Sequence, residues 1–158
     1  MTRRAVTTDS EDGTEALGAQ LAASLGPGSV ILLEGELGAG KTAFVRGLAI
    51  GLGVPEDEIS SPTFTLVQHY RGRLPLVHAD LYRIDGVEAE DLGLDELAAS
   101  GVLAVEWAEK LVRRPPDAIT VRIDDLGDDR RRITIQRPGI EPRVPRPETR
   151  DPDSYSDL

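Results

Sequence analysis

The segment Gly35–Thr42, which reads GELGAGKT, has the residue types and the spacing of a loop that binds a triphosphate. It matches the pattern G-x-x-x-x-G-K-[ST] completely, and its glycines let a loop turn backbone N–H groups inward around phosphate oxygens. An apolar run precedes the segment and a helical pattern follows it, so a helix would present its positive end to the anion. We expect Lys41 to reach the β- and γ-phosphates and Thr42 to place its hydroxyl on Mg²⁺. The complete match and both flanks disfavour an ordinary glycine turn without a ligand.

Two expected strand ends supply carboxylates for such a site. Asp80 ends the apolar run at residues 76–80, and Glu106 ends the run at residues 103–106. Either side chain can hold Mg²⁺, directly or through water, or orient an attacking water molecule. The alternative is that each is a solvated acid at a strand end. Thr63 lies where a switch threonine senses a γ-phosphate, whereas Thr65 is equally well explained as a β-branched strand residue.

The expected nucleotide is ATP rather than GTP. Guanine recognition in GTPases usually comes with an [NT]KxD segment, and this chain has none. Its second lysine, Lys110, lies instead in the sequence EKLV.

The elements that must position these residues follow from hydrophobic periodicity and turn signals. We expect strands over residues 5–8, 29–34, 63–70, 74–82, 101–107, 118–124 and 131–136, and helices over residues 10–25, 41–52 and 86–100. This order predicts an α/β fold, a P-loop NTPase-like three-layer sandwich with a mixed β-sheet and a C-terminal β-hairpin that turns at residues 126–128. Proline and charged residues dominate from residue 138, so we expect one P-loop ATPase domain, 1–137, and a disordered acidic Pro-rich tail, 138–158.

Composition narrows the classes of partner and compartment. The formal net charge is −10, and an acidic chain is a poor general binder of nucleic acid, so a role in RNA biology would depend on protein partners. The chain has no cysteine, which excludes disulfides and thiolate metal sites. No apolar run approaches the roughly 20 residues that a membrane span needs, and no secretory signal is present. These features predict a cytoplasmic protein without membrane association.

Four segments together resemble one family. They are Leu37–Thr42, Ser61–Val67, His78–Arg83 and Val105–Trp107, and their order and spacing are similar to those of TsaE, the ATPase component of bacterial threonylcarbamoyladenosine synthesis in tRNA. The resemblance covers roughly residues 5–137. It implies binding of ATP and Mg²⁺, slow ATP hydrolysis by the chain alone, and association with TsaD and TsaB. It also implies that turnover resets the synthase between cycles and that tRNA is met only indirectly, through the complex.

The resemblance also assigns roles to individual positions. It implies that Thr42 and Glu106 are metal ligands and that Asp80 is a Walker B-like acid. An N-terminal residue near Thr8 would touch the base or ribose, and one arginine of residues 130–132, here taken as Arg131, would approach the nucleotide. The expected nucleotide-binding set is therefore Thr8, Leu37, Gly38, Ala39, Gly40, Lys41, Thr42, Asp80, Trp107, Lys110 and Arg131, and the expected catalytic set is Lys41, Asp80, Glu106 and Thr63.

Several alternatives stay open at this level. His78 is either a strand residue with a satisfied ring or a catalytic group, and Tyr82 and Arg83 are either partner surface or local packing. A small-molecule kinase would use the same phosphate loop, but the expected C-terminal β-hairpin occupies the place where such kinases insert a helical lid. A non-catalytic ATP sensor would contain the same phosphate-binding residues as a slow ATPase.

Overall fold

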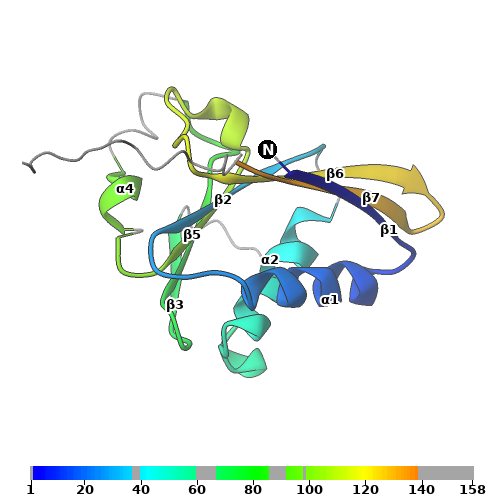
Figure 1. The fold of residues 1–158 in the computed structure, drawn as a ribbon, viewed down its shortest axis with the longest axis horizontal. Coiled ribbons are helices and arrows are strands. Elements are labelled where there is room, and N and C mark those ends of the chain that lie inside the picture. Colours follow the sequence, from blue (N-terminus) through cyan, green and yellow to red (C-terminus); the bar gives the residue numbers. More distant parts are fainter. Residues whose placement is uncertain (1, 37–39, 60–66, 86–91, 98, 139–158) are drawn as a thin grey trace, which may run out of the picture.

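The structure is a computed structural model that describes residues 2–36, 40–59, 67–85, 92–97 and 99–138. The expected site positions Leu37, Gly38, Ala39 and Thr63 lie outside these ranges, as does the expected tail from residue 139 onward. Within them, seven strands form one sheet in the order β1-β7-β6-β2-β5-β4-β3 (Figure 1). The α/β class and the mixed sheet predicted from the sequence are confirmed.

The elements alternate along the chain much as expected. The strands are β1 (Thr2–Thr8), β2 (Ser29–Glu34), β3 (Val67–Tyr70), β4 (Leu76–Asp80), β5 (Val102–Glu106), β6 (Ile119–Gly127) and β7 (Arg130–Arg137), and the helical segments are α1 (Glu11–Ala22), α2 (Lys41–Gly51), η1 (Glu56–Glu58), α4 (Leu94–Leu97) and η2 (Ala108–Lys110). The four inner strands β6, β2, β5 and β4 run parallel. The outer strands β3, β7 and β1 each join their neighbours in antiparallel fashion.

Strand β2 lies at the centre of the sheet and is apolar on both sides, as a covered parallel strand must be. Ile31 and Leu33 belong to the larger core cluster, together with residues of α1 and α2. Leu32 belongs to a second cluster on the opposite face, which includes Leu94 of α4 and Ala108 of η2. The sheet is therefore covered on both faces, and its central strand delivers the chain to the glycine-rich loop.

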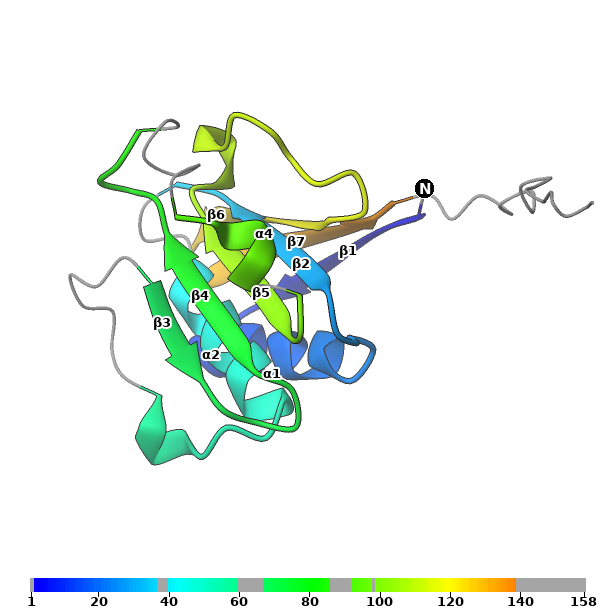
Figure 2. The same ribbon diagram turned by 90° about the vertical axis from the view of Figure 1, so that its left-hand side faces the viewer.

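Helices α1 and α2 pack side by side against one face of the sheet (Figures 1 and 2). Ser10 caps α1, because its Oγ accepts a hydrogen bond of 3.0 Å from the Gly13 N–H. Glycines let the two helices approach closely. A Cβ at Gly47 of α2 would lie 1.9 Å from the carbonyl oxygen of Glu15, and one at Gly18 of α1 would lie 2.3 Å from that of Phe44.

Several sequence-based boundaries were wrong. Strands β1 and β6 each extend three residues beyond the expected ranges 5–8 and 118–124. Helix α1 ends at Ala22 rather than at residue 25. Of the helix expected over residues 86–100, residues 86–91 and 98 are outside the described ranges, and only Leu94–Leu97 is helical in the remainder. The β6–β7 turn is formed by Asp128 and Asp129, both with positive φ, whereas a three-residue turn over 126–128 was expected. Positive φ at both central residues is the geometry of a two-residue hairpin turn, which matches the twist of its strands.

Candidate nucleotide site

The glycine-rich loop that we expect to bind phosphate, here called the phosphate loop, joins the carboxyl end of β2 to the amino end of α2, and of its residues Gly35, Glu36 and Gly40 are described. Gly40 closes it with φ of 112°, a conformation that residues with side chains rarely adopt. Gly40 is also the N-cap of α2, and as a glycine it has no side chain that could make a capping hydrogen bond. The first turn of α2 therefore has backbone N–H groups and a positive dipole end available to an anion, and Thr42 is exposed in that turn.

Lys41 is a buried cation at the centre of this arrangement, with 4% of its surface exposed. Its ammonium donates hydrogen bonds to the carbonyl oxygens of Gly35 and Glu36, the latter at 3.2 Å, and lies 4.3 Å from the centre of the Trp107 ring. Burial lowers the pKa of Lys41, and the negative charges of Glu106, Glu109 and Asp80 partly offset this effect. A chain with only two lysines thus buries one of them in its phosphate loop.

The two carboxylates that were expected at strand ends lie beside each other. Strands β4 and β5 pair in parallel with Asp80 opposite Glu106, and Glu106 is in turn opposite Leu33 of β2. Glu106 is 5% exposed, and its Oε2 lies 2.6 Å from Nε2 of His78. Asp80 Oδ1 accepts a hydrogen bond of 3.0 Å from the Tyr82 N–H. The register therefore brings both acids to the edge of the sheet where the phosphate loop begins.

An aromatic and cationic cluster follows Glu106. Trp107 has left-handed backbone angles, φ 61° and ψ 42°, which cost of order 1–3 kcal/mol for a bulky residue. The Trp107 ring contacts both the Lys41 ammonium and the ring of Tyr82, whose centroid is 5.1 Å away. Lys110 donates hydrogen bonds to the carbonyl oxygens of Tyr82 at 2.6 Å and Ile84 at 3.2 Å. Through these hydrogen bonds, Lys110 links η2 to the segment that follows β4.

A hollow of about 270 Å³ lies on the other side of Gly40. Thr8 and Arg131 are opposite each other in the β1–β7 ladder, which brings both to this region. Arg131 lies beside Gly40 and pairs with Asp125 at 3.0 Å. The hollow is lined by Ser10, Glu11, Thr14, Gly40, Ala43, Asp129 and Arg131.

Sequence reasoning did not assign Ser10, Glu11, Thr14 or Asp129 to this hollow, and Thr14 is the most buried of the four. Thr14 is 1% exposed, and its hydroxyl lies 2.8 Å from that of Thr8, which is also buried. The Thr8 hydroxyl therefore already has a partner in this structure. The sequence held one signal for Thr14: it shares a helix face with Leu17 and Leu21, and a polar side chain on a buried face needs a hydrogen-bond partner.

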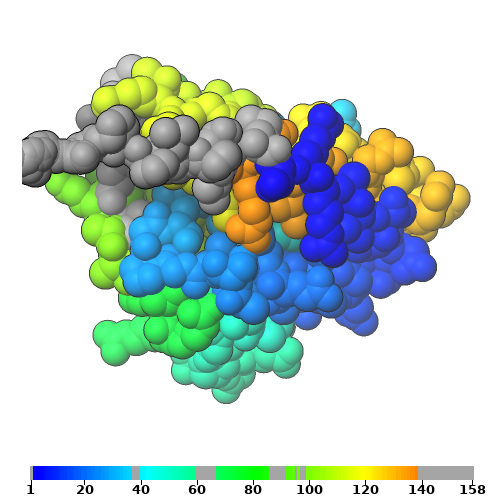
Figure 3. Space-filling view, in the orientation of Figure 1, coloured from blue at the N-terminus to red at the C-terminus, as the bar shows by residue number. Residues whose placement is uncertain are grey.

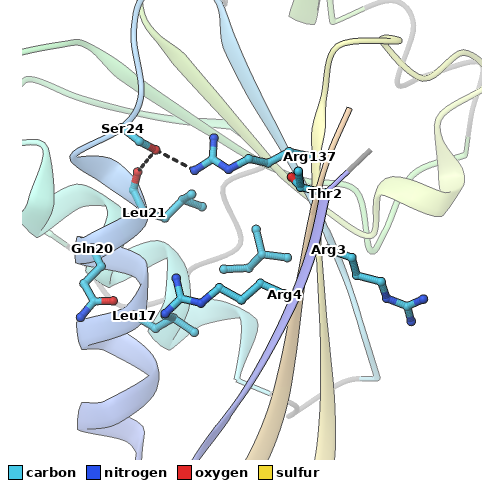
Figure 4. Close-up of a pocket in the computed structure, with 9 residues that line it drawn as sticks. Thr2, Arg3, Arg4, Leu17, Gln20, Leu21, Ser24 and Arg137 are labelled. Carbon is cyan, nitrogen blue, oxygen red and sulfur yellow. Dashed lines mark hydrogen bonds between the residues drawn. The ribbon is translucent and has the colours of Figure 1, made fainter. Parts of the chain in front are cut away.

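A second hollow, of about 300 Å³, lies away from the phosphate loop, between β1, β7 and α1 (Figure 4). Leu17 and Leu21 of α1 line it, and Arg137 reaches across its end to donate a hydrogen bond of 2.8 Å to the Ser24 hydroxyl. Figure 3 shows the surface of this region, where the N-terminal strand in blue lies beside β7 in orange. No residue of the expected site lines this hollow.

The donors at the phosphate loop fit magnesium bound together with a nucleotide. Among the described residues, no three His, Cys, Asp or Glu side chains gather into a metal-binding group. Mg²⁺ at a phosphate loop does not need such a cage, because it takes one or two protein oxygens and completes its shell with phosphate oxygens and water. The Thr42 hydroxyl and the Glu106 carboxylate are oxygen donors of this kind. In the described part of the chain, no helix is long and apolar enough to cross a membrane.

The sequence and fold match known proteins over most of the chain. A family model described as "Threonylcarbamoyl adenosine biosynthesis protein TsaE" matches residues 8–133. The tRNA threonylcarbamoyladenosine biosynthesis protein TsaE of Bacillus subtilis is 44% identical over 135 residues, 84% of each chain, and that of Treponema pallidum is 43% identical over 84% of this chain and 98% of its own. The crystal structure of Bacillus subtilis YdiB superposes with a TM-score of 0.68 at 36% identity and covers 87% of each chain. On these matches, the chain belongs to the TsaE family of threonylcarbamoyl adenosine biosynthesis proteins.

Proposed function

We propose that this protein binds and hydrolyses ATP with Mg²⁺ and supports repeated turnover of the enzymes that make N6-threonylcarbamoyladenosine in tRNA. The observation that carries the proposal is a buried lysine at an uncapped helix N-terminus, flanked by two carboxylates at adjacent strand ends. An ammonium and free backbone N–H groups suit a triphosphate, and the carboxylates suit a metal and a water molecule.

Each residue then has a defined task. Lys41 exchanges its two carbonyl partners for β- and γ-phosphate oxygens, which are stronger acceptors because they are charged. Thr42 and Glu106 hold the metal, which when bound neutralises charge on the phosphates. Asp80 or Glu106 orients a water molecule, whose oxygen forms a bond to the γ-phosphorus while the bond to the β-bridging oxygen breaks. The products are ADP and inorganic phosphate, and Lys41 with the helix N–H groups stabilises the transferred charge.

The remaining expected contacts complete the nucleotide site. We assign the hollow beside Thr8 and Arg131 to the ribose and base. Trp107 and Lys110 form the opposite wall, near the phosphates. Thr63 is proposed as the residue that senses the γ-phosphate, and the backbone of residues 37–39 as the phosphate cradle, on the sequence motif alone.

The proposed partners are TsaD and TsaB, with tRNA contacted only through that complex. The net charge of −10 supports protein partners over direct binding of RNA. The proposed compartment is the cytoplasm. We further propose that turnover is slow in the chain alone and rises in the complex, where a partner arginine can stabilise the charge on the transferred phosphoryl group.

The decisive assay compares phosphate release from ATP by the chain alone, with TsaD plus TsaB, and with small-molecule acceptors. Stimulation by the two proteins is the expected result. Transfer of the γ-phosphate to an acceptor would overturn the proposal in favour of a kinase. Tight ATP binding without phosphate release under any of these conditions would instead identify an ATP sensor.

A further inference from the structure

The carboxylate of Glu106 is deeply buried yet has one direct partner in the described part of the chain. Its side chain is 7% exposed, and that of His78 is 12% exposed. Nε2 of His78 and Oε2 of Glu106 are 2.6 Å apart, a short and strong contact. An ionised carboxylate only accepts hydrogen bonds, so the ring nitrogen is the donor. Burial of a carboxylate without a partner is costly, and His78 removes much of that cost.

The sheet dictates this contact. In the parallel β4–β5 ladder His78 is opposite Ala104, and Asp80 is opposite Glu106. Because side chains alternate along a strand, His78 and Glu106 point to the same face and are diagonal neighbours. A planar imidazole with two torsions, held on a strand, offers its N–H from a nearly fixed position. One oxygen of Glu106 is therefore fixed, and the other remains for a second partner.

A second cation competes for the same carboxylate. Of the acids near the Lys41 ammonium, Glu106 exerts the largest attraction on it, ahead of Glu109 and Asp80. In the structure Lys41 nevertheless makes its hydrogen bonds to loop carbonyls, and Glu106 makes its hydrogen bond to His78. Without His78, the Lys41 ammonium, which Glu106 already attracts, would be free to pair with the buried carboxylate, and that pair would neutralise both groups that a metal–nucleotide complex needs.

We propose that His78 is a positioning residue, which holds Glu106 by Oε2 so that the carboxylate faces the metal and stays apart from Lys41. This inference rests on the proposed function, because it needs a metal–nucleotide complex at the loop. Hydrogen bonds to a metal-ligating side chain typically change metal affinity by 10- to 100-fold when they are removed. We therefore expect His78 to affect metal binding more than it affects the binding of nucleotide without metal.

The test uses the full chain and three variants. His78→Leu removes the N–H donor while it retains volume, and His78→Gln keeps an amide N–H at about the position of Nε2. The matched control is His69→Leu, which makes the same change at the other histidine of the chain, on the exposed side of the neighbouring strand β3. If His78→Leu does not fold, His78→Asn replaces it, because the shorter amide does not reach Glu106.

Two affinities are measured for each protein. The first is that of the non-hydrolysable analogue AMPPNP in EDTA, by calorimetry, and the second is that of Mn²⁺ for the protein saturated with AMPPNP, by electron paramagnetic resonance. We expect His78→Leu to weaken Mn²⁺ binding about tenfold or more and AMPPNP binding in EDTA by less than about threefold. His78→Gln should recover most of the Mn²⁺ affinity, and His69→Leu should match the wild type.

Three results would overturn the inference: unchanged Mn²⁺ affinity in His78→Leu, an equal loss in His69→Leu, or no recovery in His78→Gln. A wild-type protein that binds no AMPPNP under either condition would instead contradict the proposed function. The two failures are therefore distinguishable within one set of measurements.

Discussion

The substitution Gly47→Ala tests how closely α1 and α2 approach each other, and with it the position of the helix that begins at Lys41. The added Cβ would lie 1.9 Å from the backbone oxygen of Glu15, whereas ordinary van der Waals contact begins near 3.4 Å. The obstacle is backbone, so no change of side-chain rotamer relieves the clash, and the helices must move apart. Overpacking of this kind costs about 1–3 kcal/mol, and a backbone clash belongs at the upper end.

Alanine also brings a gain, because it favours the helix over glycine by about 1 kcal/mol. The net loss expected is therefore about 2 kcal/mol in the free energy of unfolding, which corresponds to a fall in Tm of roughly 6–8 °C for a domain of this size. Guanidinium denaturation followed by circular dichroism measures the first quantity, and calorimetry measures the second.

The matched control for this substitution is Gly26→Ala. No atom lies within 4 Å of a Cβ at Gly26, and its φ is not in the left-handed region. We expect its stability to stay within about 0.5 kcal/mol of the wild type, or to rise slightly because alanine restricts the unfolded chain. A Gly47→Ala protein as stable as Gly26→Ala would refute the close helix contact and the placement of α2 that depends on it.

Three further predictions concern single groups of the site. Trp107 is the only tryptophan and contacts Lys41, so ATP binding that draws Lys41 toward phosphate should change tryptophan emission, and an unchanged spectrum at saturating ATP would count against this contact. Burial lowers the pKa of Lys41 in the folded protein below its pKa in the unfolded chain. At a pH between these two pKa values the unfolded state binds more protons, so the free energy of unfolding rises with pH. Lys41→Met should therefore be more stable than the wild type at neutral pH and lack this rise, as urea titrations across pH would show. Thr14→Val leaves the buried Thr8 hydroxyl without its partner and should cost about 1–3 kcal/mol, whereas the double variant Thr8→Val/Thr14→Val should recover part of that loss in a double-mutant cycle.

Sequence patterns predicted those site residues that lie within one continuous segment of the chain. The glycine-rich segment could be placed because a buried strand precedes it and a helix follows it. Asp80 and Glu106 could be singled out because each ends an apolar run, and the parallel β4–β5 register accounts for their lying side by side. Thr8 and Arg131 were expected near the nucleotide from family resemblance alone, and the β1–β7 register accounts for their proximity.

Contacts between distant segments could not be predicted in this way. His78 pairs with Glu106 because the β4–β5 register makes the two side chains diagonal neighbours. The sequence of the strand alone could not decide whether His78 is a packing residue or a functional one. The pairing of Thr8 with Thr14 depends on the angle at which the chain turns from β1 into α1. The helix expected over residues 86–100 rested on Leu92, Leu94 and Leu97 alone, and a pattern with few apolar residues does not determine where a helix begins and ends.

Calorimetric titration of ATP and Mg²⁺ into the purified full chain, beside Lys41→Met, tests the central claim most directly. The account predicts one ATP site in the wild type and an affinity at least about tenfold lower in the variant, because a charged partner of the phosphates is lost. If the wild type takes up no ATP, or if Lys41→Met binds it equally well, the buried lysine does not hold a triphosphate and the proposed function is wrong.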